Sequence, residues 1–359
     1  MQATNIGWTD FSSSPVKYRD KNTGKVVWAC VKASPGCVNC YAESLALRWG
    51  KGKPFTASNI DGVEPFLDTD ELKTLLTSQK ITGKRVFIED MSDLFGPWVP
   101  DEMIDQVFAV MGVRDDVTFQ VLTKRADRMA DYLTANAAEY RIDEAACDKR
   151  DTPGLHLSSE DWIRCGRGGL VELPLDNALI GFSAENQEWF DKRAVQVAPL
   201  VRAGWQVWTS FEPLLGPIDP TRVKVPVPPK TITVSTVAPW MKDWCEKNGL
   251  PTTQEVQNGM QPVHGHVCEL NALTGEVVTE SGIGFSGSKH LAWAVVGGES
   301  GRGHRACEVE WIADLAEAFK AAKVPIFVKQ DSGQYPGKQG RIPMPIWEMK
   351  QHPGKAVLA

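Results

Sequence analysis

Short apolar runs that end abruptly in polar residues recur along the chain, and helical patterns lie between them. Near-continuous apolar runs of this length are typical of strands that are buried on both faces of a parallel sheet. Six such runs predict strands within residues 85–93, 117–125, 177–186, 205–213, 291–300 and 324–331.

Helical periodicity appears in the segments between these runs. Residues 101–111 and 311–319 both place apolar side chains on one face, as Ile104, Val107 and Phe108 do in the first segment. Strands that alternate with helices predict an α/β fold. Roughly six such units favour a partial or full TIM-type (β/α) barrel, with a doubly wound open sheet as the alternative. In a barrel, the polar residues that follow each strand gather at the C-terminal face.

Two stretches interrupt the alternation of strands and helices. We expect one barrel domain over residues 1–359, with insertions at about 137–175 and 217–290 near the C-terminal face of the strands. The second insertion carries four residues that could ligate a metal ion, namely Cys245, His264, His266 and Cys268. An ordinary lid with scattered cysteines and histidines is the alternative.

Composition and charge indicate an ordinary globular protein. The 359 residues are 42% hydrophobic and 23% charged, and the formal net charge is −6. No apolar run approaches the roughly 18 residues that cross a bilayer, and the N-terminus lacks the features of a signal peptide. We therefore expect no membrane association and a cytoplasmic location, where cysteines stay reduced. The acidic balance argues against non-specific coating of nucleic acid, although it leaves room for a local basic groove.

Three closely spaced cysteines give the most specific chemical signal. Cys30, Cys37 and Cys40 follow the pattern Cys-x6-Cys-x2-Cys, with Ser-Pro-Gly favouring a turn before Cys37. Three thiolates can hold a metal or cluster and leave one coordination position open, which is typical of a reactive site. The alternatives are a zinc knuckle with a distant fourth ligand, or three buried thiols without a metal.

Polar residues follow each predicted strand and would converge on one rim of a barrel. Ionisable groups directly after buried strands would be costly in a core, so we expect about half to contact a ligand and half to cap helices. The rim residues are Asp90, Ser92, Lys124, Arg125, Ser183, Glu185, Asn186, Ser210, Glu212, Glu299, Ser300, Lys329 and Gln330. The sequence contains no P-loop, nucleophile elbow, zincin motif or dinucleotide fingerprint.

Eight ordered motifs resemble one family. They are Ile6-Gly-Trp8-Thr9-Asp10, Cys30-x6-Cys37-x2-Cys40-Tyr-Ala-Glu43, Met91-Ser92-Asp93-Leu94-Phe95, Phe119-Gln-Val-Leu-Thr-Lys124-Arg125, Ser183-Ala-Glu185-Asn186-Gln187, Ser210-Phe-Glu212-Pro213-Leu-Leu-Gly216, Val296-Gly-Gly-Glu299-Ser300-Gly301 and Phe327-Val-Lys329-Gln330. The chain resembles the phage-associated three-cysteine-motif family, a domain of unknown function in phages and prophages. That family is similar to divergent radical S-adenosylmethionine (SAM) enzymes.

The resemblance implies a mechanism and a set of roles. Cys30, Cys37 and Cys40 would hold a [4Fe–4S] cluster whose fourth iron binds SAM, and reductive cleavage would give a 5′-deoxyadenosyl radical that abstracts hydrogen from a substrate. The residues expected to bind SAM are Tyr41, Asp90, Ser92, Ser183, Glu185 and Ser210. The residues expected to act on the substrate are Lys124, Glu212, Glu299 and Lys329.

The expected function is therefore that of a radical-SAM-like enzyme in the cytosol of a bacterial host. A nucleotide or a base in nucleic acid is the expected substrate, and a flavodoxin or ferredoxin is the expected electron donor. Two alternatives remain. One is a zinc- or cluster-stabilised nucleic-acid-binding or partner protein without catalysis, although a DNA groove would prefer Lys and Arg to this rim of carboxylates. The other is a metal-dependent hydrolase that uses Asp90, Glu212 and Glu299.

Overall fold

The computed structural model describes residues 1–149, 152, 169–226, 247, 267–279, 282–285 and 290–354. Its largest element is an eight-stranded sheet in the order β1-β2-β6-β7-β8-β9-β14-β15. The strands are β1 (Gln2–Ala3), β2 (Phe11–Ser13), β6 (Arg85–Ile88), β7 (Thr118–Thr123), β8 (Ala178–Ser183), β9 (Gln206–Phe211), β14 (Trp293–Gly297) and β15 (Ile326–Gln330).

Strands from β2 to β15 pair in parallel and in chain order, whereas β1 is antiparallel to β2. The six strands predicted from the apolar runs are thereby confirmed as β6, β7, β8, β9, β14 and β15. Strand β2 is not among the predicted strands, because its three residues Phe-Ser-Ser form no apolar run. Sequential parallel order is the order of a (β/α) barrel and differs from that of a doubly wound sheet.

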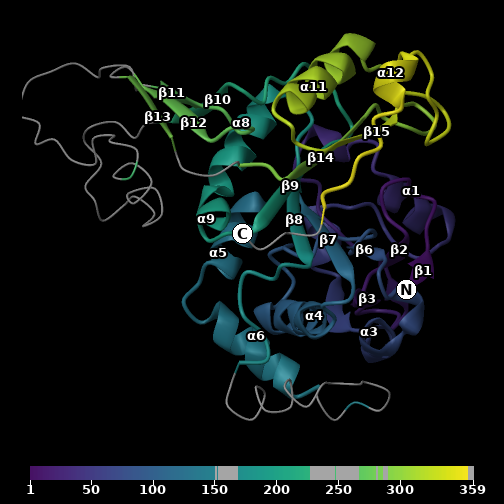
Figure 1. Ribbon diagram of the computed structural model, residues 1–359. Helices are drawn as coiled ribbons and strands as arrows, with labels where there is room; N and C mark the ends of the chain where they lie inside the picture. Colours follow the sequence, from purple (N-terminus) through teal and green to yellow (C-terminus); the bar gives the residue numbers. More distant parts are fainter. Residues whose placement is uncertain are drawn as a thin grey trace, which may run out of the picture.

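Helices connect the parallel strands and lie around the outer side of the sheet (Figure 1). They are α3 (Thr69–Thr77), α4 (Asp101–Val113), α5 (Ala126–Leu133), α6 (Ala138–Cys147), α8 (Gln187–Gln196), α9 (Ala198–Arg202) and α11 (Val309–Ala321), with a final short α12 (Met344–Trp347). The two helices predicted at 101–111 and 311–319 are confirmed as α4 and α11. The buried faces of α4 and α11 pack into the main hydrophobic core on this outer side.

The sheet is strongly curled, and Trp8 fills its concave side. Strands β6 and β14 lie four places apart in the sheet order, about 19 Å in a flat sheet. Even so, the Trp8 ring centroid is 4.9 Å from that of Phe87 on β6 and 5.9 Å from that of Trp293 on β14. Trp208 of β9 also contacts Trp8, at 5.3 Å. These aromatic rings form a second, smaller core inside the curl.

The described strands form a half-barrel whose two edges are covered differently. Strand β1 covers the edge of β2. At the other edge, the backbone N–H groups of Val328 and Gln351 bond to Met349 and Ile326, so the C-terminal segment lies antiparallel along β15. Within the described residues, the sheet therefore curls without closing into a full barrel.

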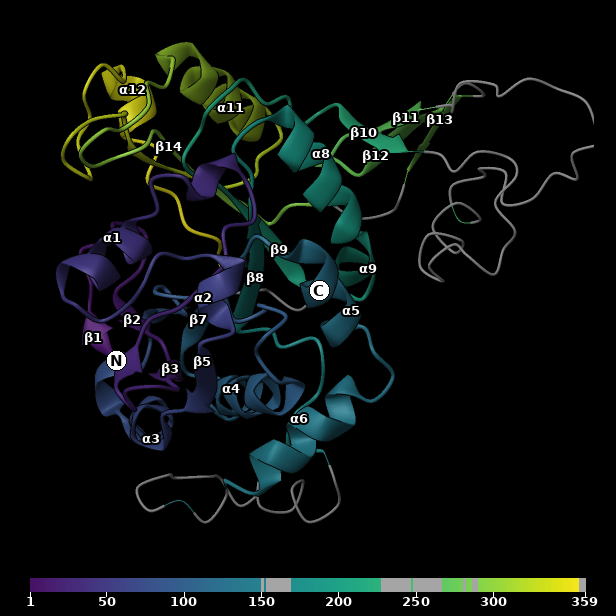
Figure 2. The ribbon, with the colours of Figure 1, turned by 180° about the vertical axis from the view of Figure 1, so that it is seen from behind.

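Two smaller sheets accompany the half-barrel. The first joins β4 (Val26–Val27), β3 (Val16–Asp20) and β5 (Val63–Leu67), and it lies between β2 and β6 in the chain together with α1 (Tyr41–Arg48) and α2 (Ala57–Ile60). The second joins β10 (Val223–Pro226), β11 (Val267–Leu270), β12 (Glu276–Thr279) and β13 (Gly282–Phe285). Figure 2 shows this second sheet beside α8, within the connection between β9 and β14.

The described flanks of the two expected insertions lie in different places. Residues 169–177 lead into the start of β8, where the side chain of Asn177 donates to backbone carbonyls of Met111, Arg114 and Val117. This flank of the first insertion therefore lies at the N-terminal edge of the sheet, because Val117 directly precedes β7. In the described part of the second insertion, β10 follows β9 in the chain and packs against α8. Cys245, His264 and His266 lie outside the described residues, as does the side chain of Cys268.

The packing of Trp8 predicts a large effect of its removal. Trp8 is 3% exposed and contacts three strands of the half-barrel, so Trp8→Ala should lower the free energy of unfolding by about 3–5 kcal/mol. Trp8→Phe should cost much less, because it keeps a ring and removes an indole N–H that has no partner among the described residues. Denaturant unfolding measures both variants. The control is Trp49→Ala, since Trp49 is 55% exposed; equal losses in Trp8→Ala and Trp49→Ala would contradict the prediction.

Candidate functional site

The three cysteines lie on one loop whose shape follows from its sequence. Pro35 opens a short 3-10 turn over Pro35–Cys37, in which the backbone N–H of Cys37 bonds to the carbonyl of Ser34. Cys40 has an extended backbone and forms the N-cap of α1. The loop therefore places one cysteine before the turn, one at its end and one at the start of a helix.

Residues at the C-terminal ends of three parallel strands hold this loop. After β7, Arg125 Nη2 donates to the carbonyl of Val31 at 2.8 Å. After β8, Glu185 Oε1 accepts from the backbone N–H of Gly36 at 3.0 Å. After β14, Glu299 Oε2 accepts from Asn39 Nδ2 at 2.8 Å. We call these three contacts the strand-end clamp. The clamp fixes the cysteine loop across the C-terminal edge of the half-barrel.

Each residue of the clamp is fixed by a second charge. Arg125 pairs with Asp93 at 2.8 Å, and Glu185 pairs with the buried Arg193 at 3.0 Å. Glu299 forms a bidentate pair with Arg305, whose Nη1 also donates to the carbonyl of Pro35.

Hydrogen bonds from these partners hold the pKa of Glu299 below its usual value despite its burial. Glu185 also has a lowered pKa, because Arg193 and the N–H of Gly36 outweigh the effect of burial. Both carboxylates are therefore engaged in holding the loop.

The thiols influence one another and their charged neighbours. Burial raises the pKa of Cys30 to about 12, with Asp93 acting in the same direction and Arg125 opposing it. Negative charge on Cys37 or Cys40 would raise the pKa of Cys30 further. Burial also raises the pKa of Cys40, against the helix N–H groups and Lys124. All three cysteines are free thiols of intermediate exposure. A positively charged metal group at this loop would favour the thiolates that the protein alone disfavours.

Below the loop, polar side chains share the concave face of the sheet. Ser183 pairs in register with Ser210, which places their side chains on the same face. Lys124 follows Thr123, the register partner of Phe182, and so belongs to the same row as Ser183. Among the described residues, no side chain or carbonyl accepts a hydrogen bond from Lys124 Nζ, which lies close enough to Cys40 and Glu185 to influence their pKa values.

An ion pair crosses the neighbouring strands at the same edge. Lys329 of β15 and Glu212 after β9 lie 3.1 Å apart, although β14 runs between their strands. A Cβ atom on Gly297 of β14 would lie 2.8 Å from Glu212 Oε1, so a side chain there would displace the pair. The neighbouring Gly298 similarly accommodates the backbone of Ser332. The glycine pair thus serves a close approach within the protein.

The remaining predicted residues gather around β6. Tyr41 donates from its hydroxyl to the carbonyl of Asp90, and Ser14 donates to the Asp90 carboxylate at 2.9 Å. Burial raises the pKa of Asp90. The hydroxyl of Ser92 lies 2.7 Å from that of Tyr18, a buried residue of the main core. Asp90 and Tyr41 thus belong to the surroundings of the cysteine loop, whereas Ser92 is engaged on the core side.

Four residues of this region are not among the predicted site residues. They are Asn39, Glu89, Arg193 and Arg305. Asn39 could have been found from its place between two cysteines. Glu89 has a backbone φ of 60° and is 2% exposed, and its Oε1 accepts from the N–H of Val16 at 2.7 Å. The left-handed backbone turns its side chain into the protein, and the sequence carries no signal of that turn.

A single metal ion and a cluster require different arrangements of donor atoms. No group of three His, Cys, Asp or Glu side chains in the described parts of the chain is arranged to hold one metal ion. A single tetrahedral Zn²⁺ would need its thiolate sulfurs about 3.8 Å apart, whereas a cluster spreads three thiolates over three irons. Three thiols on one clamped loop, next to Lys124 and Arg125, fit the donor chemistry of a cluster. Within the described chain, no helix has the length and apolar character needed to cross a bilayer.

The strand-end clamp predicts how the loop responds to its loss. Glu299→Gln should weaken the bidentate pair with Arg305, and with it the contacts to Pro35 and Asn39. In the metal-free protein, alkylation of Cys37 and Cys40 by iodoacetamide, followed by mass spectrometry, should become several-fold faster. The control is Glu317→Gln on α11, where the side chain is 62% exposed. Unchanged labelling rates in Glu299→Gln would show that Glu299 does not hold the loop.

Glu89 predicts a pH-dependent effect on stability. Burial raises the pKa of Glu89 well above its usual value, and the negative charges of Asp90, Glu71 and Asp93 act in the same direction, against the hydrogen bond from Val16. Its stability contribution is complete below the unfolded pKa of about 4.5 and is lost as the pH rises through the folded pKa. Glu89→Gln should therefore increase the free energy of unfolding by on the order of 1 kcal/mol at pH 7.5, and by almost nothing at pH 4. Urea unfolding at both pH values measures this, and a gain that is equal at both would contradict it.

Comparisons with known proteins identify a family but no individual relative or solved structure. Searches of curated proteins and of solved structures returned no match. One family profile matches residues 4–354, which is nearly the whole chain. The chain therefore belongs to the DUF5131 family, described as proteins of unknown function.

Proposed function

We propose that this protein is a radical-SAM-like iron–sulfur enzyme built on a partial TIM-type barrel. Cys30, Cys37 and Cys40 would hold a [4Fe–4S] cluster by one thiolate each. The sequential parallel order of seven strands supports the barrel relationship, and three free thiols on one loop support the cluster. The association with phages and the bacterial cytosol belongs to the same proposal and rests on the resemblance of the motifs.

One observation carries the proposal, namely the strand-end clamp. Arg125, Glu185 and Glu299 come from three different strand ends, yet each bonds to the short loop between Cys30 and Cys40. A loop that served only to join β4 to α1 would need no contacts from β7, β8 and β14. The clamp holds three thiols over a concave face that carries unengaged polar groups. That arrangement suits a reaction centre at the C-terminal edge of a (β/α) sheet.

The residues under the loop have chemistry that suits SAM. When bound, the cluster and SAM would supply a 5′-deoxyadenosyl radical that abstracts a hydrogen atom from the substrate. The hydroxyls of Ser183 and Ser210 can donate to and accept from ribose hydroxyls. Asp90 can accept from an ammonium group, and the half-exposed ring of Tyr41 can stack on adenine. Lys124 and Arg125 offset the negative charge of the thiolates.

The ion pair of Glu212 and Lys329 is the candidate for positioning a substrate. Both side chains are partly exposed, at 13% and 21%, so a ligand at the edge could reach them. Lys329 can bind a phosphate and Glu212 can accept from an amine or hydroxyl of a base. A nucleotide or a base in nucleic acid offers both groups. A flavodoxin or ferredoxin would supply the electron.

The decisive experiment is anaerobic reconstitution with iron and sulfide, followed by EPR of the reduced protein with and without SAM. We expect a [4Fe–4S] signal that changes when SAM is added. Cys30→Ala, Cys37→Ala and Cys40→Ala should each lose that signal, whereas Cys307→Ala should keep it, because Cys307 is a buried free cysteine of the core. Bound zinc in place of iron, or a cluster whose EPR signal does not change when SAM is added, would reject the enzyme proposal and favour a metal-stabilised binding protein.

A further inference from the structure

The segment that carries the cysteines has the opposite charge from the chain as a whole. Residues 15–60 contain eight Lys and Arg against two Asp and Glu, a formal charge of +6, whereas the whole chain has −6. Both acidic side chains are buried and paired, Asp20 with Lys53 and Glu43 with Lys32. The exposed surface of this segment therefore carries almost only positive charge.

Exposed aromatic and basic residues follow one another at the end of α1. Arg48, Trp49 and Lys51 are all exposed, and Trp49 is 55% exposed. Gly50 has a φ of 63° and nothing within 4 Å of where a Cβ would be, so the backbone there is open to solvent. Within the described chain, no carboxylate forms an ion pair with Arg48 or Lys51. The exposed indole thus lies between two cations that no carboxylate pairs with in the described part of the chain.

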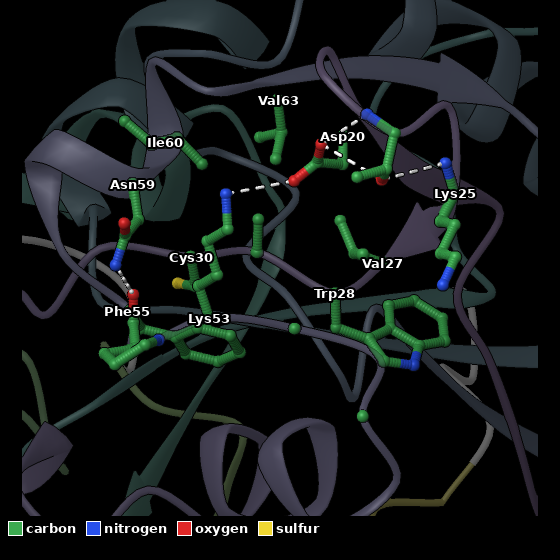
Figure 3. A pocket seen from close by; sticks show the side chains of 15 residues that line it. Asp20, Lys25, Val27, Trp28, Cys30, Lys53, Phe55, Asn59, Ile60 and Val63 are labelled. Carbon is green, nitrogen blue, oxygen red and sulfur yellow. Dashed lines mark hydrogen bonds and ion pairs between the residues drawn. The ribbon is translucent and has the colours of Figure 1, made fainter.

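This segment lies next to a pocket that reaches the cysteine loop (Figure 3). The N–H of Trp28 bonds to the carbonyl of Lys51, which joins the end of α1 to the strand that leads to Cys30. Gly50, Gly52 and Cys30 all line the pocket, whose volume is about 150 Å³. A cavity of that size holds one aromatic ring. Lys25, Lys53 and Asp20 lie along the pocket, with Lys53 paired to Asp20 at 3.0 Å, and the side chains of Trp28 and Phe55 contribute aromatic walls.

We propose that this basic face, formed by Lys25, Arg48, Trp49 and Lys51, binds single-stranded nucleic acid. An unpaired base stacks on Trp49, phosphates lie beside Arg48 and Lys51, and the pocket has room for one neighbouring base. Single-stranded nucleic acids are bound elsewhere by this combination of stacking aromatics and cations that follow the backbone. The inference rests on the proposed function in one respect, because it names a nucleic-acid chain, and not a free nucleotide, as what that enzyme acts on.

Fluorescence anisotropy of labelled 20-nucleotide DNA and RNA with the full-length protein tests the proposal. Trp49→Ala should weaken single-strand binding by about 10-fold, since stacking on one aromatic contributes that much. Lys51→Glu should weaken it by a similar factor and reduce the slope of log affinity against log salt by about 1 or more. The matched controls are Tyr140→Ala and Lys320→Glu, an aromatic residue that is 70% exposed and a lysine that is 65% exposed, on α6 and α11. Both controls should bind as the unmodified protein does.

Three results would overturn the proposal. They are no single-strand binding at low salt, equal losses in the variants and their controls, or tighter binding to duplex than to single strands. Binding of an acidic flavodoxin that depends on Lys51, with no binding of oligonucleotides, would identify the face as a protein-docking surface. Because anisotropy needs no cluster and EPR needs no nucleic acid, this proposal and the enzyme proposal can fail separately.

Discussion

The curl of the parallel sheet is the constraint on which the rest of the structure depends. A flat sheet would hold the ends of β7 and β14 about 14 Å apart, three strand spacings, whereas the curl turns these strand ends toward the one loop, residues 30–40, that Arg125 and Glu299 both contact. Trp8 contacts β6, β9 and β14 together and so fixes the curl from inside. The loop residues 30–40 can then be bound from three strand ends. Packing on the concave side of the sheet thereby helps to position the cysteine loop at its C-terminal edge.

The clamp is built from charges, and this choice has a physical consequence. Glu185 and Arg193 are both only 1% exposed as side chains, so their pairing must offset a large loss of hydration. A buried pair of this kind adds little net stability, but breaking one partner leaves an uncompensated charge. A movement of Glu185 that breaks its pair with Arg193 therefore costs free energy, which keeps the Glu185 carboxylate in the position where it accepts from Gly36. Charged contacts hold the loop in one position more strictly than apolar contacts would, because apolar surfaces slide at little cost.

The sequence predicts the sheet better than it predicts the site. Six of the strands are apolar runs of standard length, and their periodicity needs no tertiary information. Strand β2 could not be predicted from an apolar run, because two of its three residues are serines and its place in the sheet comes from pairing with β6. The rim residues were predictable as a group, because parallel strands end at one edge. Their individual contacts were not, because the bond from Glu185 to Gly36 spans 149 residues and that from Glu299 to Asn39 spans 260. Position relative to a strand gives a residue's neighbourhood but not its partner.

The cations near the cysteine loop form two sets, one partly buried in the protein and one exposed to solvent. Arg125 and Lys124 lie inside, where they change the pKa values of Cys30 and Cys40. Arg48 and Lys51 lie in solvent, where salt screens a charge beyond about 8–10 Å. The outer cations therefore add little to the stability of thiolates or of a cluster, and their attraction is available to a partner that touches the surface. The cations near the cysteine loop thus divide into an inner set that acts on the thiols and an outer set that is available to a polyanion. On the two proposals above, this arrangement would bring nucleic acid to one side of the proposed reaction centre.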